Sequence, residues 1–307
     1  MVSISDESIG RAADVLRRGG LIGLPTETVY GLAADATNDT AVSEVFRVKA
    51  RPSDHPLILH LARVEALNEW VVGLSGAADM LARECWPGPL TLVVGAADSL
   101  PRRPLGGRNT AAIRIPAHDA ARAVIDLLGR PVAAPSANQF GRVSPTTADH
   151  VCDDLGPDVS LVLDGGPTVY GIESTIVDTT GPSLQILRHG AIPVEDLEML
   201  VGQRIEDADG PARAPGMLGS HYAPSCDVLL ATDLDEAASL GDACERRGKT
   251  WRLLPTAASL PLYAATLYDD LRTCDNAGVD VIVAVLPPPQ GLGRAIRDRL
   301  MKAAAPR

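Results

Sequence analysis

The stretch Leu21-Ile-Gly-Leu-Pro-Thr-Glu-Thr-Val-Tyr-Gly31 joins a short apolar run to a turn that carries two hydroxyl groups. The apolar run fits a buried strand, and Pro25 ends it. Thr26 and Thr28 follow at the carboxyl edge of that strand, which is where open α/β sheets bind ligands. Taken alone, the segment fits a ligand-binding loop and a plain turn equally well.

The same design recurs at Ala133-Ala-Pro-Ser-Ala-Asn138. Ser136 and Asn138 offer a hydroxyl and an amide just after a short strand, and both groups can bond phosphate or carboxylate oxygens. Ser136 lacks the Gly-x-Ser-x-Gly context of an exposed nucleophile, so we expect it to act as a hydrogen-bond donor. Ser144 follows in a Ser-Pro-Thr cluster, where it either adds a hydroxyl to the site or helps to cap the next helix, which is the simpler role.

Two further segments carry cations. Lys49 and Arg51 stand at the end of a predicted helix, just before a proline. An extended backbone there would let them converge on a ligand, whereas stabilisation of the last helical carbonyls is the simpler interpretation of each taken singly. A glycine-rich stretch, 165–171, precedes Ser174, and Arg188 at the end of the next predicted strand could pair with a phosphate.

The first two hundred residues alternate helical and strand patterns, which predicts an α/β fold with a twisted open sheet. Helices are expected near 9–16, from 38 or 39 onward, and near 64–72, 75–85, 117–128, 146–155 and 193–201. Strands are expected at 21–24, 57–61, 90–94, 111–115, 132–134, 161–163 and 175–177.

Residues 203–225 contain several Pro and Gly and no apolar period, which indicates a linker. After it, strands are expected at 228–231, 251–254 and 279–286, alternating with helices near 235–247, 262–274 and 293–303. Strand–helix–strand order of this kind builds a small parallel sheet. We therefore predict two domains, 1–202 and 226–307, joined by the linker.

The chain of 307 residues has a formal net charge of −11. Nucleic-acid binding usually needs a basic face, so this balance argues against stable RNA or DNA binding, although a local basic cleft remains possible. No apolar run approaches the roughly 20 residues that cross a bilayer, and the N-terminus lacks a signal-peptide pattern, which predicts a cytoplasmic protein without membrane contact. The cysteines are scattered and the histidines lack the spacing of metal ligands, so we predict no metal site held by the protein. The sequence has no Gly-x-x-x-x-Gly-Lys-[Ser/Thr] motif, so we predict no P-loop.

Taken together, these segments resemble the YrdC-like threonylcarbamoyl-AMP synthases in their longer, two-domain form. The resemblance runs in the family's order over nearly the whole chain. The matching segments are Pro25–Gly31, Lys49–Arg51, His55–His60, Trp86–Thr91, Ala112–Pro116, Ala134–Asn138, Glu173–Ile176, Ala214–Met217, His221–Pro224 and Gly291–Arg299. The resemblance implies a YrdC-like twisted sheet with helices that form a basic cavity, followed by a small Rossmann-like parallel α/β domain.

The resemblance also implies roles for single residues. The catalytic signature would be Lys49, Arg51, Ser136 and Asn138. L-threonine would be held by Thr28, His60, Arg114, Ala134 and Ser174. ATP would be held by Arg51, His55, Thr110, Ser136, Ser144, Arg188 and Gly216. The linker would fold over the cavity as a lid, with Pro215–Met217, His221 and Tyr222 nearest to the ligand.

The implied activity is that of a nucleotidyltransferase, which condenses L-threonine, bicarbonate and ATP into threonylcarbamoyl-AMP and releases pyrophosphate. Mg²⁺ would accompany ATP, and downstream tRNA threonylcarbamoyl-transfer proteins would use the product to form N6-threonylcarbamoyladenosine at tRNA position 37. A cavity lined by cations can promote this reaction by positioning and electrostatics, without a protein nucleophile. Two alternatives are a carbamoyl-adenylate former of the hydrogenase-maturation type and an RNA-binding module.

Overall fold

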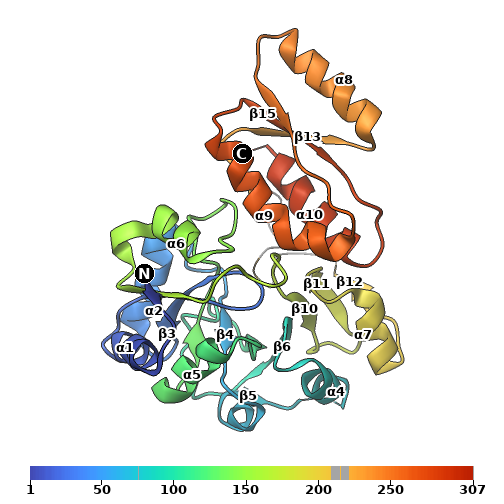
Figure 1. The fold of residues 1–307 in the computed structure, drawn as a ribbon. Helices are drawn as coiled ribbons and strands as arrows, with labels where there is room; N and C mark the ends of the chain where they lie inside the picture. Colours follow the sequence, from blue (N-terminus) through green and yellow to red (C-terminus); the bar gives the residue numbers. More distant parts are fainter. Residues whose placement is uncertain (75, 209–214, 216–220, 307) are drawn as a thin grey trace.

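The computed structural model describes residues 1–74, 76–208, 215 and 221–306. Within these residues the chain forms a large sheet from residues 2–207 and a small sheet from residues 227–285 (Figure 1). We call residues 1–208 the N-terminal part and residues 221–306 the C-terminal part. The predicted fold class, a mixed α/β sheet followed by a small parallel one, is confirmed.

The large sheet contains both parallel and antiparallel pairs. Its strands are β1 (Val2–Ser3), β2 (Ile22–Leu24), β3 (Gly31–Asp35), β4 (Ile58–His60), β5 (Val71–Val72), β6 (Leu90–Ala96), β7 (Thr110–Arg114), β8 (Val132–Ala133), β9 (Leu161–Asp164), β10 (Thr175–Asp178), β11 (Gln185–Arg188) and β12 (Glu206–Asp207). They lie in the order β1-β9-β2-β3-β8-β4-β7-β6-β10-β11-β12, and β5 pairs with β6. Because this order differs from the chain order, loops that are distant in sequence become neighbours.

The helices of the N-terminal part agree with the predicted ones to within a few residues. They are α1 (Asp6–Arg17), α2 (Asp39–Lys49), α3 (Leu67–Trp70), α4 (Gly76–Cys85), α5 (Asp119–Leu128), α6 (Ala148–Leu155) and α7 (Val194–Val201), with 3-10 turns at Val64–Ala66 and Gly156–Asp158. Local sequence explains their starts, since the side chains of Ser5 and Asn38 accept main-chain N–H bonds in the first turns of α1 and α2. No described helix has the length and apolar character needed to traverse a bilayer.

β3 is a strand that the sequence pattern does not predict, because Gly31–Asp35 holds glycine and alanine where strands favour β-branched residues. It pairs antiparallel with β2, so residues 25–30 form a hairpin loop. Tyr30 anchors this loop: its hydroxyl donates to the Gly166 carbonyl at 2.8 Å and accepts from the Gly165 amide at 3.0 Å.

The two polar loops that the sequence analysis singled out lie side by side, since β3 pairs with β8. The Ala137 amide donates to the Tyr30 carbonyl at 2.8 Å, and Gly31 forms a β-bridge with Ser136. A Cβ on Gly31 would stand only 3.0 Å from the Cβ of Ala134. Glycine therefore allows the close approach of the two loops.

The small sheet is parallel throughout. Its strands are β13 (Asp227–Ala231), β14 (Trp251–Leu253) and β15 (Val281–Val285), in the order β13-β15-β14. Its helices are α8 (Leu234–Glu245), α9 (Leu260–Asn276) and α10 (Leu292–Ala304). Figure 1 shows α8 on the outer face of this sheet, and α9 and α10 on the face toward the N-terminal part.

The two parts share an apolar core. Val29 and Ile172 from the N-terminal part belong to the same cluster of buried residues as Leu267 on α9. A largely buried ion pair crosses the same boundary, where Arg272 of α9 lies 2.6 Å from Asp154 of α6. Apolar burial and this ion pair both hold the two parts together.

The predicted linker contains one element that its sequence does not indicate. Glu206–Asp207 forms β12, which pairs parallel with β11 at the edge of the large sheet. Both residues are exposed, so no apolar pattern marks the strand. Residues 209–214 and 216–220, which include Gly216, lie outside the described residues. The division into 1–202, 203–225 and 226–307 stays a prediction.

Gly190→Ala should destabilise the protein, because a Cβ there would lie 2.3 Å from the carbonyl carbon of Ser174 and 2.4 Å from the carbonyl oxygen of Glu173. Overpacking against backbone of this kind costs about 1–3 kcal/mol. Gly10→Ala is the control, since a Cβ in that turn of α1 meets nothing within 4 Å, and it should stabilise by about 0.5–1 kcal/mol. Urea unfolding measures the free energy of unfolding of both variants. A Gly190→Ala protein as stable as the wild type would contradict the close contact of Gly190 with the backbone of Glu173 and Ser174.

Candidate active site

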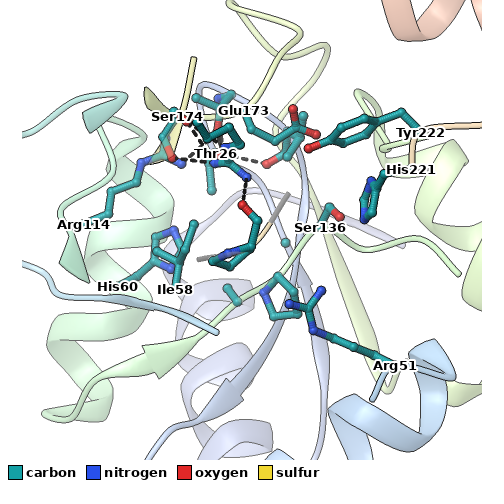
Figure 2. Close-up of a pocket in the computed structure, with 17 residues that line it drawn as sticks. Thr26, Arg51, Ile58, His60, Arg114, Ser136, Glu173, Ser174, His221 and Tyr222 are labelled. Carbon is teal, nitrogen blue, oxygen red and sulfur yellow. Dashed lines mark hydrogen bonds between the residues drawn. The ribbon is translucent and has the colours of Figure 1, made fainter. Parts of the chain in front are cut away.

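A pocket opens where the loops after β2 and β8, the ends of β4 and β7 and the segment before β10 converge (Figure 2). Eight of the predicted site residues line it: Thr28, Arg51, His60, Arg114, Ala134, Ser136, Ser174 and Arg188. Thr26, Glu173, Pro215, His221 and Tyr222 line it as well. The structure therefore brings together residues from one end of the N-terminal part to the other.

Lys49 lies behind the pocket wall rather than in it. Its side chain is buried, and Nζ donates to the carbonyls of Ser136 and Asn138, each at 2.5 Å. Burial, with the positive charge of Arg51 nearby, lowers the pKa of Lys49 well below its ordinary range. Lys49 therefore shapes the loop that presents Ser136, and these bonds do not involve the carbonyls of its own helix.

Asn138 also bonds within its own loop. Its amide nitrogen donates to the carbonyls of Gln139 and Arg142, each at 2.8 Å. Its buried Oδ1 has no hydrogen-bond partner among the described residues. Like Lys49, Asn138 is placed to hold the loop after β8, not to line the pocket.

Three other predicted nucleotide contacts do not line the pocket. Thr110 begins β7, whereas Arg114 ends it, about 13 Å away at the usual strand rise. His55 packs against Phe140, with ring centroids 5.9 Å apart. Ser144 bonds to a pocket residue instead, as described below, and Thr147, which directly follows the Ser-Pro-Thr cluster, provides the cap of α6.

Arg114 dominates one side of the pocket. Its Nη2 lies 2.7 Å from Glu27 Oε1, and Nη1 donates to the Thr28 hydroxyl at 2.8 Å. Its Nε donates to the Gly88 carbonyl at 3.2 Å. His60 lies on the same side (Figure 2). Burial and the charge of Arg114 lower the pKa of His60 to about 3, so its imidazole is neutral at physiological pH.

Arg51 lies on the other side, near Ser136 and His221 (Figure 2). Its Nη2 donates to the Pro56 carbonyl at 3.1 Å, and the guanidinium lies 5.6 Å from the ring centroid of Phe140. Burial lowers the pKa of Arg51 to about 10, which leaves it charged at neutral pH. Burial also lowers the pKa of His221 to about 3, so this imidazole is neutral.

Arg188 ends β11 beside the start of β10. Its Nε and Nη2 donate to the Ser174 carbonyl at 3.1 and 2.9 Å, and Nη2 also donates to the Ser174 hydroxyl at 3.0 Å. That hydroxyl shares a further bond of 2.8 Å with the hydroxyl of Thr91. Arg188 and Ser174 are thus one rigid unit in the pocket wall.

Glu173 is a pocket residue that sequence reasoning gave no role. Its carboxylate accepts bonds from Ser144 at 2.7 Å, from Tyr268 at 2.9 and 3.0 Å, and from Arg299 at 2.8 Å. Burial opposes its ionisation, but the charges of Arg299 and Arg188 and the Ser144 bond outweigh burial and lower the pKa of Glu173 to about 2. A carboxyl between apolar Ile172 and a buried strand is the one local signal that could have marked it.

The resulting pocket favours anions. Arg51 and Arg188 are held by main-chain carbonyls, and the charge of Arg114 is opposed by Glu27. Both histidines are neutral, and the charge of Glu173 is balanced by Arg299. Fixed cations in a site of low dielectric bind phosphate and carboxylate groups more strongly than they would in water. Among the described residues, no group of three or more His, Cys, Asp or Glu side chains could hold a metal ion.

Two family models cover most of the chain. Residues 14–190 match a model described as telomere recombination, and residues 192–305 match one described as the C-terminal domain of threonylcarbamoyl-AMP synthase. The threonylcarbamoyl-AMP synthase of Pyrococcus abyssi is 39% identical over 98% of this chain and 95% of its own length. The chain belongs to the threonylcarbamoyl-AMP synthase family.

A second relative in this family, the threonylcarbamoyl-AMP synthase of Bacillus subtilis, is 38% identical over 100% of this chain and 95% of its own. The crystal structure of P. abyssi Sua5 complexed with L-threonine aligns with a TM-score of 0.93 at 37% identity, covering 99% of this chain and 98% of that one. The resemblance to the longer, two-domain synthases and the fold that it implied are confirmed.

The buried histidines predict acid sensitivity. Unfolded His221 titrates near 6.5 and folded His221 near 3, so in this range the unfolded chain binds more protons and stability falls as pH is lowered. His221→Gln should reduce the slope of unfolding free energy against pH in this window by up to about 1.4 kcal/mol per pH unit. Urea titrations at several pH values measure the slope, and an unchanged slope would mean that folded His221 titrates normally.

Proposed function

We propose that this protein is a threonylcarbamoyl-AMP synthase, which joins L-threonine, bicarbonate and ATP and releases pyrophosphate. The observation that carries the proposal is the meeting of Arg51, Arg114 and Arg188, from distant segments, in one pocket. Relatives that match over nearly their full length at 38% and 39% identity bear the same name. The product would supply the formation of N6-threonylcarbamoyladenosine at tRNA position 37.

We assign L-threonine to the side of Arg114. A guanidinium can bind the carboxylate of the amino acid through two parallel bonds. The hydroxyls of Thr28 and Ser174 and the main chain at Ala134 line the same pocket, and neutral His60 can donate or accept one bond there. The L-threonine complex of P. abyssi Sua5 supports a threonine site in this fold.

We assign the phosphates of ATP to Arg51, Arg188 and the Ser136 hydroxyl. All three line the pocket, and each arginine has one edge fixed by a main-chain carbonyl. Lys49 and Asn138, predicted as catalytic, would act through the loop that carries Ser136. Fixed donors of this kind need no reorganisation when charge develops on the phosphoryl oxygens.

The reaction needs two bond-forming steps. The amine of threonine attacks the carbon of bicarbonate, and loss of water leaves a carbamate. A carbamate oxygen then attacks the α-phosphorus of ATP, and the bond to the bridging oxygen breaks so that pyrophosphate leaves. The protein's part is to hold mutually repelling anions in contact and to stabilise charge on the α-phosphate, which suits a site of arginines without a nucleophile.

Mg²⁺ would enter as part of the MgATP substrate. The carboxylates at the pocket, Glu27 and Glu173, are paired with Arg114 and Arg299, so neither is a ready metal ligand. The chain therefore does not fit a resident metal at this site, and the ion would be carried by the phosphates.

The pocket would also protect its product from water. Pro215, His221 and Tyr222 from the predicted lid line it, and Arg188 Nη1 lies 3.4 Å from the Pro215 carbonyl. Adenylates of this type hydrolyse readily, so closure of a lid would have an evident use. We propose that downstream threonylcarbamoyl-transfer proteins in the cytoplasm receive the product and pass its threonylcarbamoyl group to tRNA.

Purified protein with ATP, Mg²⁺ and labelled bicarbonate should form a labelled adenylate and pyrophosphate only when L-threonine is present. Chromatography of the adenylate and a coupled pyrophosphate assay measure the two products. Equal rates with L-serine, or with no amino acid, would refute the substrate assignment. No product under any condition would refute the proposed function.

Arg51→Ala should lower kcat/KM by about 100-fold or more, the usual loss when a donor to developing charge is removed. Arg63→Ala is the matched control, because Arg63 is exposed and pairs with the surface carboxylate of Asp126, and it should leave kcat/KM unchanged. Thermal melting of both variants should stay close to the wild type. If Arg51→Ala lost its fold together with its activity, Arg51 would be a structural residue.

A further inference from the structure

Arg299 of α10 is fully buried, yet it does not line the pocket. Its Nε donates to Glu173 Oε2 at 2.8 Å, and its Nη2 donates to the His189 carbonyl at 2.9 Å. Its guanidinium also lies 5.0 Å from the ring centroid of Tyr222. One side chain from the C-terminal part thus contacts three segments that build the pocket wall.

Two of these contacts adjoin residues assigned to substrates. Glu173 directly precedes Ser174, and His189 directly follows Arg188. Because peptide units are planar and stiff, a shift of Glu173 or His189 moves its neighbour with it. Arg299 therefore acts on both members of the Ser174–Arg188 unit.

The two segments are also packed on each other. The Ala191 amide donates to the Glu173 carbonyl at 3.0 Å, and Gly190 brings its backbone against Ser174 too closely for any side chain. They cannot slide independently, so their common orientation depends on what holds them from outside. Arg299, with Tyr268 on the same carboxylate, is that support from the C-terminal part.

Charge gives Arg299 a second effect. A buried carboxylate such as Glu173 is costly unless a cation compensates it. Among the charges that lower the pKa of Glu173, that of Arg299 is the largest and that of Arg188 is the next. Arg299 also pairs with Asp298 at 2.5 Å, and Lys302 at 2.7 Å from Asp298 balances that second carboxylate. Without Arg299, the carboxylate would draw the guanidinium of Arg188 toward itself and away from a bound anion.

We infer that Arg299 is a positioning residue for the ATP side of the pocket: it neutralises Glu173 and holds His189, and so orients Arg188 toward the phosphates. Helix α10 then contributes to the active site without touching a substrate. This inference rests on the proposed function, since it names what tunes the phosphate-binding arginine of that reaction.

The test compares Arg299→Met with the wild type in the threonine-dependent pyrophosphate assay. Arg299→Met should raise the KM for ATP about tenfold or more, with a smaller rise in the KM for L-threonine. Arg294→Met is the matched control, because Arg294 lies on the same helix and pairs across the same boundary with Glu195 at 3.2 Å, away from the pocket lining. It should leave both KM values within about twofold of the wild type.

The charge argument predicts a rescue. Adding Glu173→Gln to Arg299→Met removes the uncompensated carboxylate, so the double variant should have a lower KM for ATP than Arg299→Met alone. A purely structural role would instead predict that the second substitution makes the enzyme worse or leaves it unchanged. Circular dichroism and melting curves establish that each variant is folded.

If Arg299→Met does not fold, Arg299→Lys and Tyr268→Phe give the same test in milder form. Arg299→Lys keeps the charge but loses the fork that joins Glu173 to the His189 carbonyl, and Tyr268→Phe loses the hydroxyl that bonds Glu173. Each should raise the KM for ATP more than the KM for L-threonine. A wild-type KM for ATP in the folded variants, or an Arg299→Met effect without rescue, would overturn the inference. A wild-type enzyme that forms no product would refute the proposed function instead.

Discussion

Cations buried side by side repel one another and lose their hydration, and the pocket of this protein depends on how that cost is met. Arg114 has a carboxylate partner in Glu27, whereas Arg51, Arg188 and Lys49 are held mainly by main-chain carbonyls. Carbonyl dipoles stabilise a cation without cancelling its charge. The pocket therefore keeps a positive potential, which anionic substrates balance when they bind. This explains how a chain with a net charge of −11 can contain a basic cavity.

Local sequence signals were enough to predict most elements of the fold. The helices with clear apolar periods and capping residues, such as α2 after Asn38, lie where the pattern indicated, and so do the elements of the C-terminal part. β1, β3, β5 and β12 were missed, and β5 falls at the end of a predicted helix. β1, β5 and β12 have two residues each, whereas β3 is buried but rich in glycine and alanine. In all four, pairing with a neighbouring strand decides the structure, not propensity.

The candidate site could be predicted as a set of segments, but not side chain by side chain. Polar residues after strands gave Thr28 and Ser136, but the same pattern gave Asn138, and the helix end that gave Arg51 also gave Lys49. Lys49 and Asn138 bond within the loop after β8, behind the pocket wall. Spacing along a turn does not determine which side chain faces a cavity. The role of Glu173 was out of reach, because its partners Tyr268 and Arg299 lie 95 and 126 residues away.

The sequence separation between Glu173 and Arg299 also affects when the pocket is completed during synthesis. A ribosome makes the segments that carry Ser174 and Arg188 long before it makes α10, and N-terminal domains generally fold first during synthesis. Until α10 docks, the nascent chain has the walls of the pocket but an uncompensated carboxylate within them. A chain in which α10 has not yet docked would therefore bind ATP more weakly in this pocket than the finished protein does.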